Sequence, residues 1–378
     1  MTRRHLASAL VALASLAVLA VACTTAPVGG GTAGTPSTSV PGSTTTTVGP
    51  NGDDSYTIAF IGDSEPRMRG NTNAEVSAYI ANLAAYRTTR SLYFDYGGGD
   101  THRVSPELVV LGGDISADRD TSIDTDMPLW QQLYDKGIGM VAGFGNHDWE
   151  PVQWSDGSLG YSLAGHTSNL NTTAFTRETY RRSANTLPGF TYREFGPTSS
   201  YGPTTFLSSY KGVDLANFNT FLYQPSYTYP DGWPLSCNLL SGGAGCQIFA
   251  SAEPQIAALA GALSTDPART TLFMEHYPLT TGDGWWDDYG ASGTTLAQRK
   301  ARLLGLMTRF DNTALLAGHN HSPGHYTHVV GGRTLDEYVA PYFGGDNGED
   351  LTRGGGFVAL LVSPTKGILE VKFVPGGI

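Results

Sequence analysis

The chain has 378 residues with 34 acidic and 23 basic side chains, which gives a formal net charge of −11 at pH 7. A chain this acidic has no basic stripe that would displace counterions from phosphates, so we do not expect it to bind a nucleic-acid duplex. Small substrates, or metal ions that invert the local charge, fit this composition better. Beyond the N-terminal segment, about 320 residues remain, enough for one large α/β domain with insertions or for two smaller domains.

The first 23 residues have the layout of an export signal. Two arginines precede an apolar stretch, and small residues lead to Cys23 in "AVAC". This ending resembles a bacterial lipobox, so we expect an exported lipoprotein that Cys23 tethers to the membrane; the alternative is cleavage and release as a secreted protein. Residues 24–54 are rich in Thr, Ser, Gly and Pro, which predicts a disordered linker ahead of the domain at 55–378.

Five short apolar runs predict strands that are buried on both faces, because each run ends abruptly in a small residue followed by polar groups. They cover residues 56–65, 107–114, 139–148, 269–278 and 313–321. Amphipathic stretches between them predict helices at 73–92, 126–137, 251–264 and 294–310. Two strand-like runs around "SPTKG" predict a closing hairpin within 355–377. The alternation predicts an α/β fold.

Residues from about 150 to 250 differ from the rest of the chain. They are rich in Tyr, Ser, Thr, Gly and Asn and have weak periodicity, which predicts a long insertion of loops and short strands that shapes a substrate cleft. Cys237 and Cys246 lie in this segment. Outside the cytosol two nearby cysteines more often form a disulfide than a metal site, so we expect a disulfide that closes this Gly-rich loop.

All five predicted strands end in residues that can bind a metal ion. These residues are Asp63, Glu65, Asp114, Asn146, His147, Asp148, His276, His319 and His321. Active sites of open α/β sheets lie outside the carboxyl ends of the strands, so we expect the five ends to form one cluster. His319 and His321 are one residue apart, and in extended backbone their imidazoles would point the same way. The alternative is a pair of surface histidines at a loop tip.

The chemistry of this set favours two metal ions. Carboxylates, imidazoles and one amide oxygen, without thiolates, suit divalent or trivalent ions such as Mn, Fe, Zn or Ca. Seven of the nine residues are candidate ligands, namely Asp63, Glu65, Asp114, Asn146, His276, His319 and His321. Seven ligands exceed the four of a tetrahedral zinc site. Two ions about 3.5–4 Å apart, bridged by one carboxylate, would use all seven and clamp the attacking and leaving oxygens of an in-line displacement.

Five motifs in a fixed order resemble the signature of the calcineurin-like metallophosphoesterases. They are "GDSE" at 62–65, "GGD" at 112–114, "GNHD" at 145–148, "MEHYP" at 274–278 and "GHNH" at 318–321. The resemblance implies a four-layer α/β/β/α sandwich of two mixed sheets flanked by helices. It also implies metal-dependent hydrolysis of a small phosphoester, either a phosphomonoester, a phosphodiester or a nucleotide.

The same resemblance implies a role for each motif residue. Asp114 would bridge the two ions, and Asp63 and His321 would hold the first ion. The second ion would be held by Asn146, His276 and His319. A metal-bridging hydroxide would attack phosphorus, and His147, oriented by Asp148, would protonate the leaving alkoxide or stabilise charge on the phosphoryl oxygens.

Glu65 departs from the family pattern, which has histidine at this position. A glutamate can bind the first metal and favour harder ions such as Mn, Mg or Ca. It can instead leave that site weak, or act as a base beside the metal. The alternative to an enzyme is therefore a non-catalytic surface protein that keeps the fold and one metal ion.

Aromatic residues follow His276 in the sequence. Trp285, Trp286 and Tyr289 are expected either to form a wall of the substrate pocket or to pack over the site without touching substrate. Residues 340–350 are a second candidate for a pocket wall.

Overall fold

The computed structural model describes residues 54–64, 72–95, 102–115, 123–145, 148, 152–153, 159–160, 163–195, 205–218, 226–228, 234–236, 256–279, 296–343 and 355–375. The predicted export signal and linker lie outside these ranges. So do the site residues Cys23, Glu65, Asn146, His147, Cys237, Cys246, Trp285, Trp286 and Tyr289. Within the described ranges, no helix is both long and apolar enough to cross a membrane.

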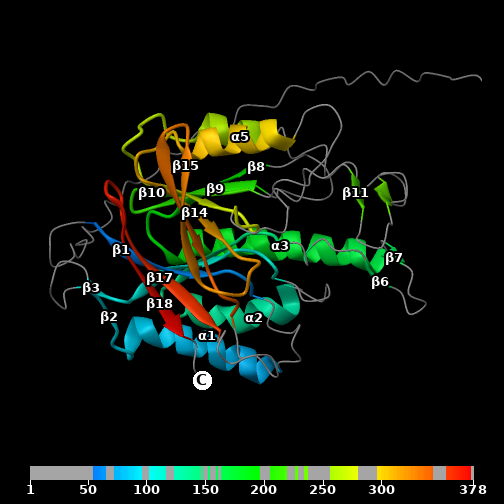
Figure 1. Cartoon of the computed structure of the whole chain (residues 1–378). Coiled ribbons are helices and arrows are strands. Elements are labelled where there is room, and N and C mark those ends of the chain that lie inside the picture. Colours follow the sequence, from blue (N-terminus) through cyan, green and yellow to red (C-terminus); the bar gives the residue numbers. More distant parts are fainter. Residues whose placement is uncertain are drawn as a thin grey trace, which may run out of the picture. The chain divides into compact units, whose positions relative to one another are not determined.

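A five-stranded sheet has the strand order β18-β17-β1-β4-β5 (Figure 1). Its parallel strands are β1 (Tyr56–Ile61), β4 (Pro106–Leu111) and β5 (Gly139–Ala142). The strand β17 (Gly356–Ser363) runs antiparallel to β1 and to β18 (Gly367–Pro375). The predicted C-terminal hairpin is therefore confirmed as β17 and β18, and the sheet is mixed.

A seven-stranded sheet has the order β15-β16-β14-β13-β10-β9-β8. Its strands are β8 (Thr191–Phe195), β9 (Thr205–Tyr210), β10 (Val213–Asn217), β13 (Thr271–Met274), β14 (Thr313–Ala317), β15 (Gly324–Val330) and β16 (Arg333–Val339). The strands β10, β13, β14 and β16 are parallel, and antiparallel pairs complete both sides. Three small pairs are β2 (Tyr93–Phe94) with β3 (His102–Arg103), β6 (Val152–Gln153) with β7 (Leu159–Gly160), and β11 (Ser226–Thr228) with β12 (Pro234–Ser236).

The two large sheets pack against each other through apolar side chains. Ile58 and Phe60 of β1 belong to the same buried cluster as Leu215, Leu272 and Leu315 of the seven-stranded sheet. Successive residues of a strand point to opposite faces, so alternate residues of β1 face this core and the core under the helices. The five predicted strands are all present, and burial on both faces explains their continuous apolar runs.

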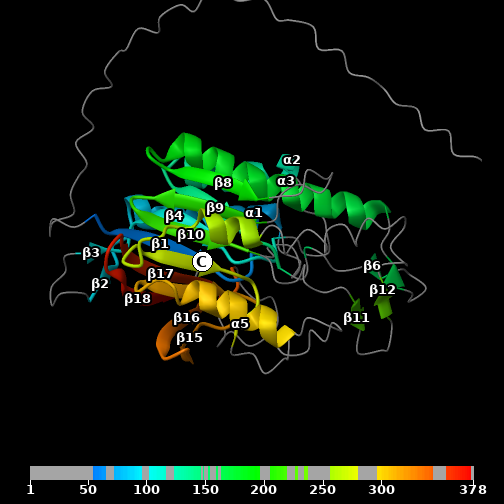
Figure 2. The same ribbon diagram turned by 90° about the horizontal axis from the view of Figure 1, so that it is seen from above.

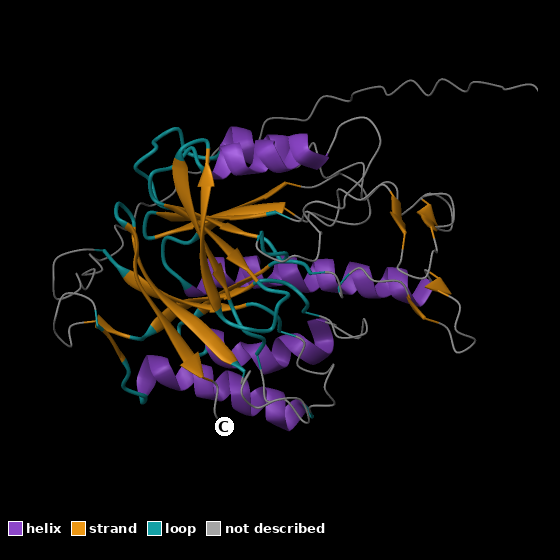
Figure 3. Ribbon diagram, in the orientation of Figure 1, coloured by secondary structure: helices purple, strands orange, loops and turns teal. Residues whose placement is uncertain are grey.

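Helices flank the pair of sheets. The helices α1 (Asn73–Thr88) and α2 (Ile123–Tyr134) lie on the outer side of the five-stranded sheet, and α5 (Leu296–Met307) lies beyond the seven-stranded sheet (Figure 3). A short helix over residues 256–262 also packs on the latter. The predicted mixed α/β fold with two mixed sheets and flanking helices is confirmed.

The helix α1 begins at Asn73, where the sequence predicts it to begin. Thr72 is the N-cap, and its Oγ1 accepts a hydrogen bond from the backbone N–H of Glu75 at 3.3 Å. The Glu75 carboxylate accepts in return from the N–H of Thr72 at 2.7 Å. This reciprocal capping box satisfies two N–H groups that the first turn of a helix leaves without partners.

The prediction of loops and short strands at about 150–250 is wrong for residues 163–186, which form a helix, whereas short strands are present at 191–195, 205–210 and 213–217. The helix is the 24-residue α3 (Leu163–Thr186), and the strands are β8, β9 and β10 of the main sheet. Figure 2 shows α3 on the β8 side of the sheets, opposite β15 and β16. The buried face of α3 includes the polar residues Thr173, Thr176, Thr179 and Ser183. The helix therefore lacks the apolar stripe that reveals an amphipathic helix in a sequence.

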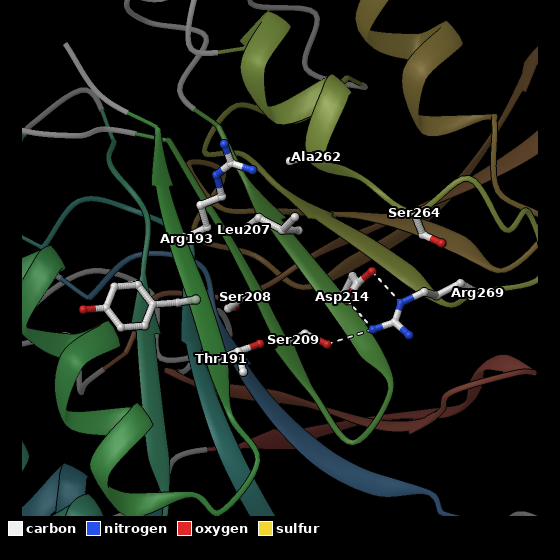
Figure 4. Close-up of a pocket in the computed structure, with 10 residues that line it drawn as sticks. Thr191, Arg193, Leu207, Ser208, Ser209, Asp214, Ala262, Ser264 and Arg269 are labelled. Carbon is white, nitrogen blue, oxygen red and sulfur yellow. Dashed lines mark hydrogen bonds and ion pairs between the residues drawn. The ribbon is translucent and has the colours of Figure 1, made fainter. Parts of the chain in front are cut away.

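A hollow of about 330 Å3 lies on the outer face of the seven-stranded sheet (Figure 4). It is at the amino ends of β10 and β13. There the guanidinium of Arg269 donates two hydrogen bonds of 2.6 Å to Asp214 of β10 and one of 2.8 Å to Ser209 of β9. Asp214 is buried and compensates the charge of Arg269, so these contacts join β9 and β10 to the segment before β13.

We predict that Arg269→Met lowers the free energy of unfolding by about 1–3 kcal/mol, because it leaves the buried Asp214 carboxylate without its cation. Chemical denaturation measures this change. Arg177→Met is the matched control, since it removes an exposed ion pair with Glu194 and should change stability by about 0.5 kcal/mol or less. Equal effects of the two substitutions would contradict the assigned role of Arg269.

Candidate metal centre

The carboxyl ends of strands from both sheets meet at one place. Gly62 follows β1 and Gly318 follows β14, and their backbones lie so close that a Cβ on Gly318 would be 2.3 Å from the Gly62 oxygen. Asp63 forms a parallel β-bridge with Tyr342, which follows β16. The five predicted strand ends therefore do converge, but three come from one sheet and two from the other. Loops after β1, β4, β13 and β14 reach a common volume.

Asp63 is fully buried at this junction, at 0% exposure. Neither of its carboxylate oxygens has a hydrogen-bond partner among the residues that the structure describes. Its Oδ1 lies 3.6 Å from Nε2 of His321 and 3.9 Å from Nε2 of His276. A buried carboxylate without donors costs several kcal/mol, so this position suits a bound cation.

Asp114, His276 and His319 form a group that can hold a metal ion. Each offers one ligand atom, and these atoms lie within 4.8 Å of one another. Asp114 follows β4, and its Oδ2 is 3.0 Å from Nε2 of His276. On the other side of the ring, Nδ1 of His276 lies 3.2 Å from the carbonyl oxygen of Gly112. A proton on Nδ1 would leave the Nε2 lone pair facing the carboxylate, which is the arrangement that a metal ion between them stabilises.

Negative charge dominates the surroundings of His276. Burial by itself would lower the pKa of this imidazole. The carboxylates of Asp114, Asp63 and Glu275 outweigh burial and raise the pKa to about 10. The centre therefore attracts positive charge, in agreement with a site for cations.

The two histidines of "GHNH" are placed by left-handed backbone. His319 has φ of 67° and His321 has φ of 53°. The expectation of extended backbone at these two residues is therefore wrong. The ring of His319 lies 5.2 Å from that of His276, whereas His321 lies beside Asp63 and its ring is 5.7 Å from that of Tyr342.

Left-handed backbone is concentrated at this centre. Among the described residues, the non-glycine positions with positive φ are Asp114, Lys211, His319 and His321. Three of the four are predicted metal ligands. Such conformations cost about 1–3 kcal/mol each and cluster where function requires them, so their concentration here supports a functional site.

Asp148 joins two of the ligand loops. Its buried carboxylate accepts hydrogen bonds from the backbone N–H of Gly145 at 2.8 Å and from that of Ile115 at 3.1 Å. Ile115 follows Asp114, and Gly145 precedes Asn146 in the sequence. Asp148 was predicted to orient His147, which lies outside the described residues. Within the described part, Asp148 holds the backbone at Ile115 and Gly145, which adjoin Asp114 and Asn146 in the sequence.

Two tyrosines contact the histidines. Tyr277 is buried, and its ring packs edge-on against His319 with centroids 4.8 Å apart. The ring of Tyr342 is tilted against that of His321, with centroids 5.7 Å apart. The position of Tyr277 directly after His276 was a signal that the sequence reasoning did not use. Tyr342 belongs to the segment 340–350, considered only as a pocket wall.

The donor set fits a metal ion of intermediate or hard character. Carboxylate oxygens and imidazole nitrogens are present, and no cysteine lies within the described residues. Such sets suit Mn, Fe or Zn. The group Asp114, His276 and His319, with Asp63 and His321 beside it, is therefore a candidate metal centre.

No family model matches the sequence, and no curated protein matches it. Among solved structures, the chain is similar to the crystal structure of phosphopantetheinyl hydrolase from Mycobacterium tuberculosis. The two chains are 15% identical, and the match covers 76% of this chain and 89% of that chain with a TM-score of 0.36. A likeness at this TM-score carries no conclusion about function.

We predict that Gly145→Ala disrupts the centre, because a Cβ at this position would be 2.0 Å from Oδ1 of Asp114. The bound metal, measured by elemental analysis of purified protein, should fall. Gly305→Ala in α5 is the matched control, since a Cβ there meets nothing within 4 Å and alanine favours helix. Unchanged metal content in Gly145→Ala would contradict the placement of Asp114 as a ligand.

Proposed function

We propose that this protein is a metal-dependent hydrolase of phosphoesters with a dinuclear metal centre. The observation that carries the proposal is the burial of Asp63 and Asp114 side by side with His276, His319 and His321, at the meeting point of two sheets. Two carboxylates and three imidazoles exceed the needs of one structural ion. The order of the five sequence motifs supports the same conclusion.

Each residue then has a defined task. Asp114 is central, within 3.0 Å of His276, and would contact both ions. Asp63, His321 and, through its sequence position, Glu65 would hold the first ion. Asn146, His276 and His319 would hold the second ion. When bound, the two ions would supply a nucleophilic oxygen at neutral pH and neutralise the charge of the phosphoryl group.

The chain itself would orient the substrate and manage protons. His147 would donate a proton to the oxygen of the leaving group, or a hydrogen bond to a phosphoryl oxygen. Asp148 would fix the loop that carries His147, because it holds the N–H of Gly145. The buried ring of Tyr277 against His319 restricts water on one side of the ligands.

The substrate would be a small phosphoester, with Trp285, Trp286 and Tyr289 as a pocket wall. An acidic chain repels long polyanions, which supports a small substrate over a nucleic acid. The export signal and Cys23 support an enzyme tethered at the cell surface, where Cys237 and Cys246 would form their disulfide.

We predict that the purified protein binds two divalent ions per chain and hydrolyses phosphoesters. A panel of aryl phosphate monoesters and diesters, assayed with Mn, Fe, Zn or Ca, measures the activity. Chelation should abolish it and added metal should restore it. One ion per chain with no turnover on any ester would instead identify a non-catalytic metal-binding protein.

We predict that His147→Ala lowers kcat by about 10²–10⁴-fold while the metal content stays at the wild-type value, because His147 acts on protons and is not a ligand. Steady-state kinetics and elemental analysis measure both quantities. His325→Ala is the matched control, since His325 is exposed on β15 and pairs with Asp336. Loss of metal in His147→Ala would overturn the assigned role.

A further inference from the structure

Asn217 is the last residue of β10 and is buried at 1% exposure. Its Nδ2 donates a hydrogen bond of 3.0 Å to the carbonyl oxygen of Ala142, the last residue of β5. The same amide group donates to Oη of Tyr180 in α3 at 3.3 Å. One side chain thus connects the seven-stranded sheet, the five-stranded sheet and α3.

The hydrogen bond to Ala142 satisfies a carbonyl group at the edge of the five-stranded sheet. The strand β5 is at the edge of its sheet. The backbone N–H and C=O groups of Val141 point toward β4, so those of Met140 and Ala142 point away from the sheet. Ser183 of α3 serves Met140, accepting from its N–H at 2.7 Å and donating to its carbonyl at 2.6 Å. Asn217 donates to the carbonyl of Ala142, which is nearer in the sequence than Met140 to the predicted ligand Asn146.

Asn217 lies between two ligand-bearing loops. In the sheet register it is opposite Met274, two residues before His276, and the N–H of Phe218 donates to the Met274 carbonyl at 3.2 Å. On the other side, Ala142 is four residues before Asn146. The contact between Asn217 and Ala142 therefore joins the strand beside β13, which leads to His276, to β5, which leads to Asn146.

Gly143 makes this contact sterically feasible. A Cβ on Gly143 would lie 3.3 Å from Oδ1 of Asn217, which is a tight contact, and 3.5 Å from Cε of Met274, which is an ordinary one. The bare glycine backbone leaves room for the amide to lie against the end of β5. The sequence therefore provides both the polar link and the space that it occupies.

We propose that Asn217 is a positioning residue that sets the spacing between the end of β5 and His276, and so the affinity for the second metal ion. The inference rests on the proposed dinuclear function. Substitution of residues that orient ligands typically weakens metal affinity by about 10–100-fold, and we expect an effect of this size for the second ion alone.

The test compares Asn217→Leu with Ser183→Ala in the full chain. Both substitutions remove a buried link to the edge of β5, but only Asn217 lies at the end that carries the ligands. Calorimetric titration with Mn²⁺ should show unchanged affinity for the first ion in both variants and weaker binding of the second ion only in Asn217→Leu. The electron paramagnetic resonance spectrum of that variant should change from that of a coupled pair to that of a single ion at an equal Mn²⁺ dose.

The outcomes separate this inference from the proposed function. If the wild type binds only one ion, both the dinuclear function and the role of Asn217 are overturned. If the wild type binds two ions and Asn217→Leu behaves like Ser183→Ala, only the role of Asn217 is overturned. Should Asn217→Leu fail to fold, Tyr180→Phe removes one partner of the same amide. Tyr180→Phe should lower the affinity for the second ion by less than Asn217→Leu would. Unchanged affinity for that ion would overturn the inference.

Discussion

The close approach of two backbones, at Gly62 and Gly318, is the constraint on which the centre depends. Side chains normally hold packed sheets about 10 Å apart. At this point a Cβ on Gly62 would be 2.4 Å from the carbonyl oxygen of Ala340, so no side chain can be accommodated. The ends of β1 and β14 therefore come together. Asp63, which follows β1, and His321, which follows β14, can then approach each other across the two sheets. Most of the ligand geometry follows from this single contact.

The electrostatics of the centre follow from the same convergence. Loops that meet inside the molecule carry their carboxylates out of water, and Asp63 and Asp114 are both buried. The raised pKa of His276 is the response of the chain's own groups to that charge. The left-handed backbone of Asp114, His319 and His321 costs conformational free energy, in addition to the electrostatic free energy of burying the carboxylates. A cation bound between these groups would offset both costs.

The sequence predicted the five central strands well, for a physical reason. Strands that are buried on both faces must be continuous apolar runs, and polar groups right after them, such as Asp63 or His276, stand out. The sequence failed where burial uses polar side chains. The helix α3 packs through threonines and Ser183, and β10 reads "VDLAN", so neither has an apolar signature. Asn217 was missed with β10. The left-handed φ of His319 and His321 is imposed by tertiary packing, which no local pattern encodes.

The two ends of the sandwich treat buried acids differently, and this contrast strengthens the case for a metal. At the amino ends, buried Asp214 is paired with Arg269, and half-buried Glu107 accepts from Oη of Tyr210 at 2.8 Å and from Lys211 at 2.9 Å. The fold is thus able to supply a donor for a carboxylate wherever stability requires one. At the carboxyl ends, Asp63 has no such donor among the described residues. Buried carboxylate oxygens without a hydrogen-bond partner therefore occur, among the described residues, at both oxygens of Asp63 and at Oδ2 of Asp114 in the centre, and a cation is the partner that fits them.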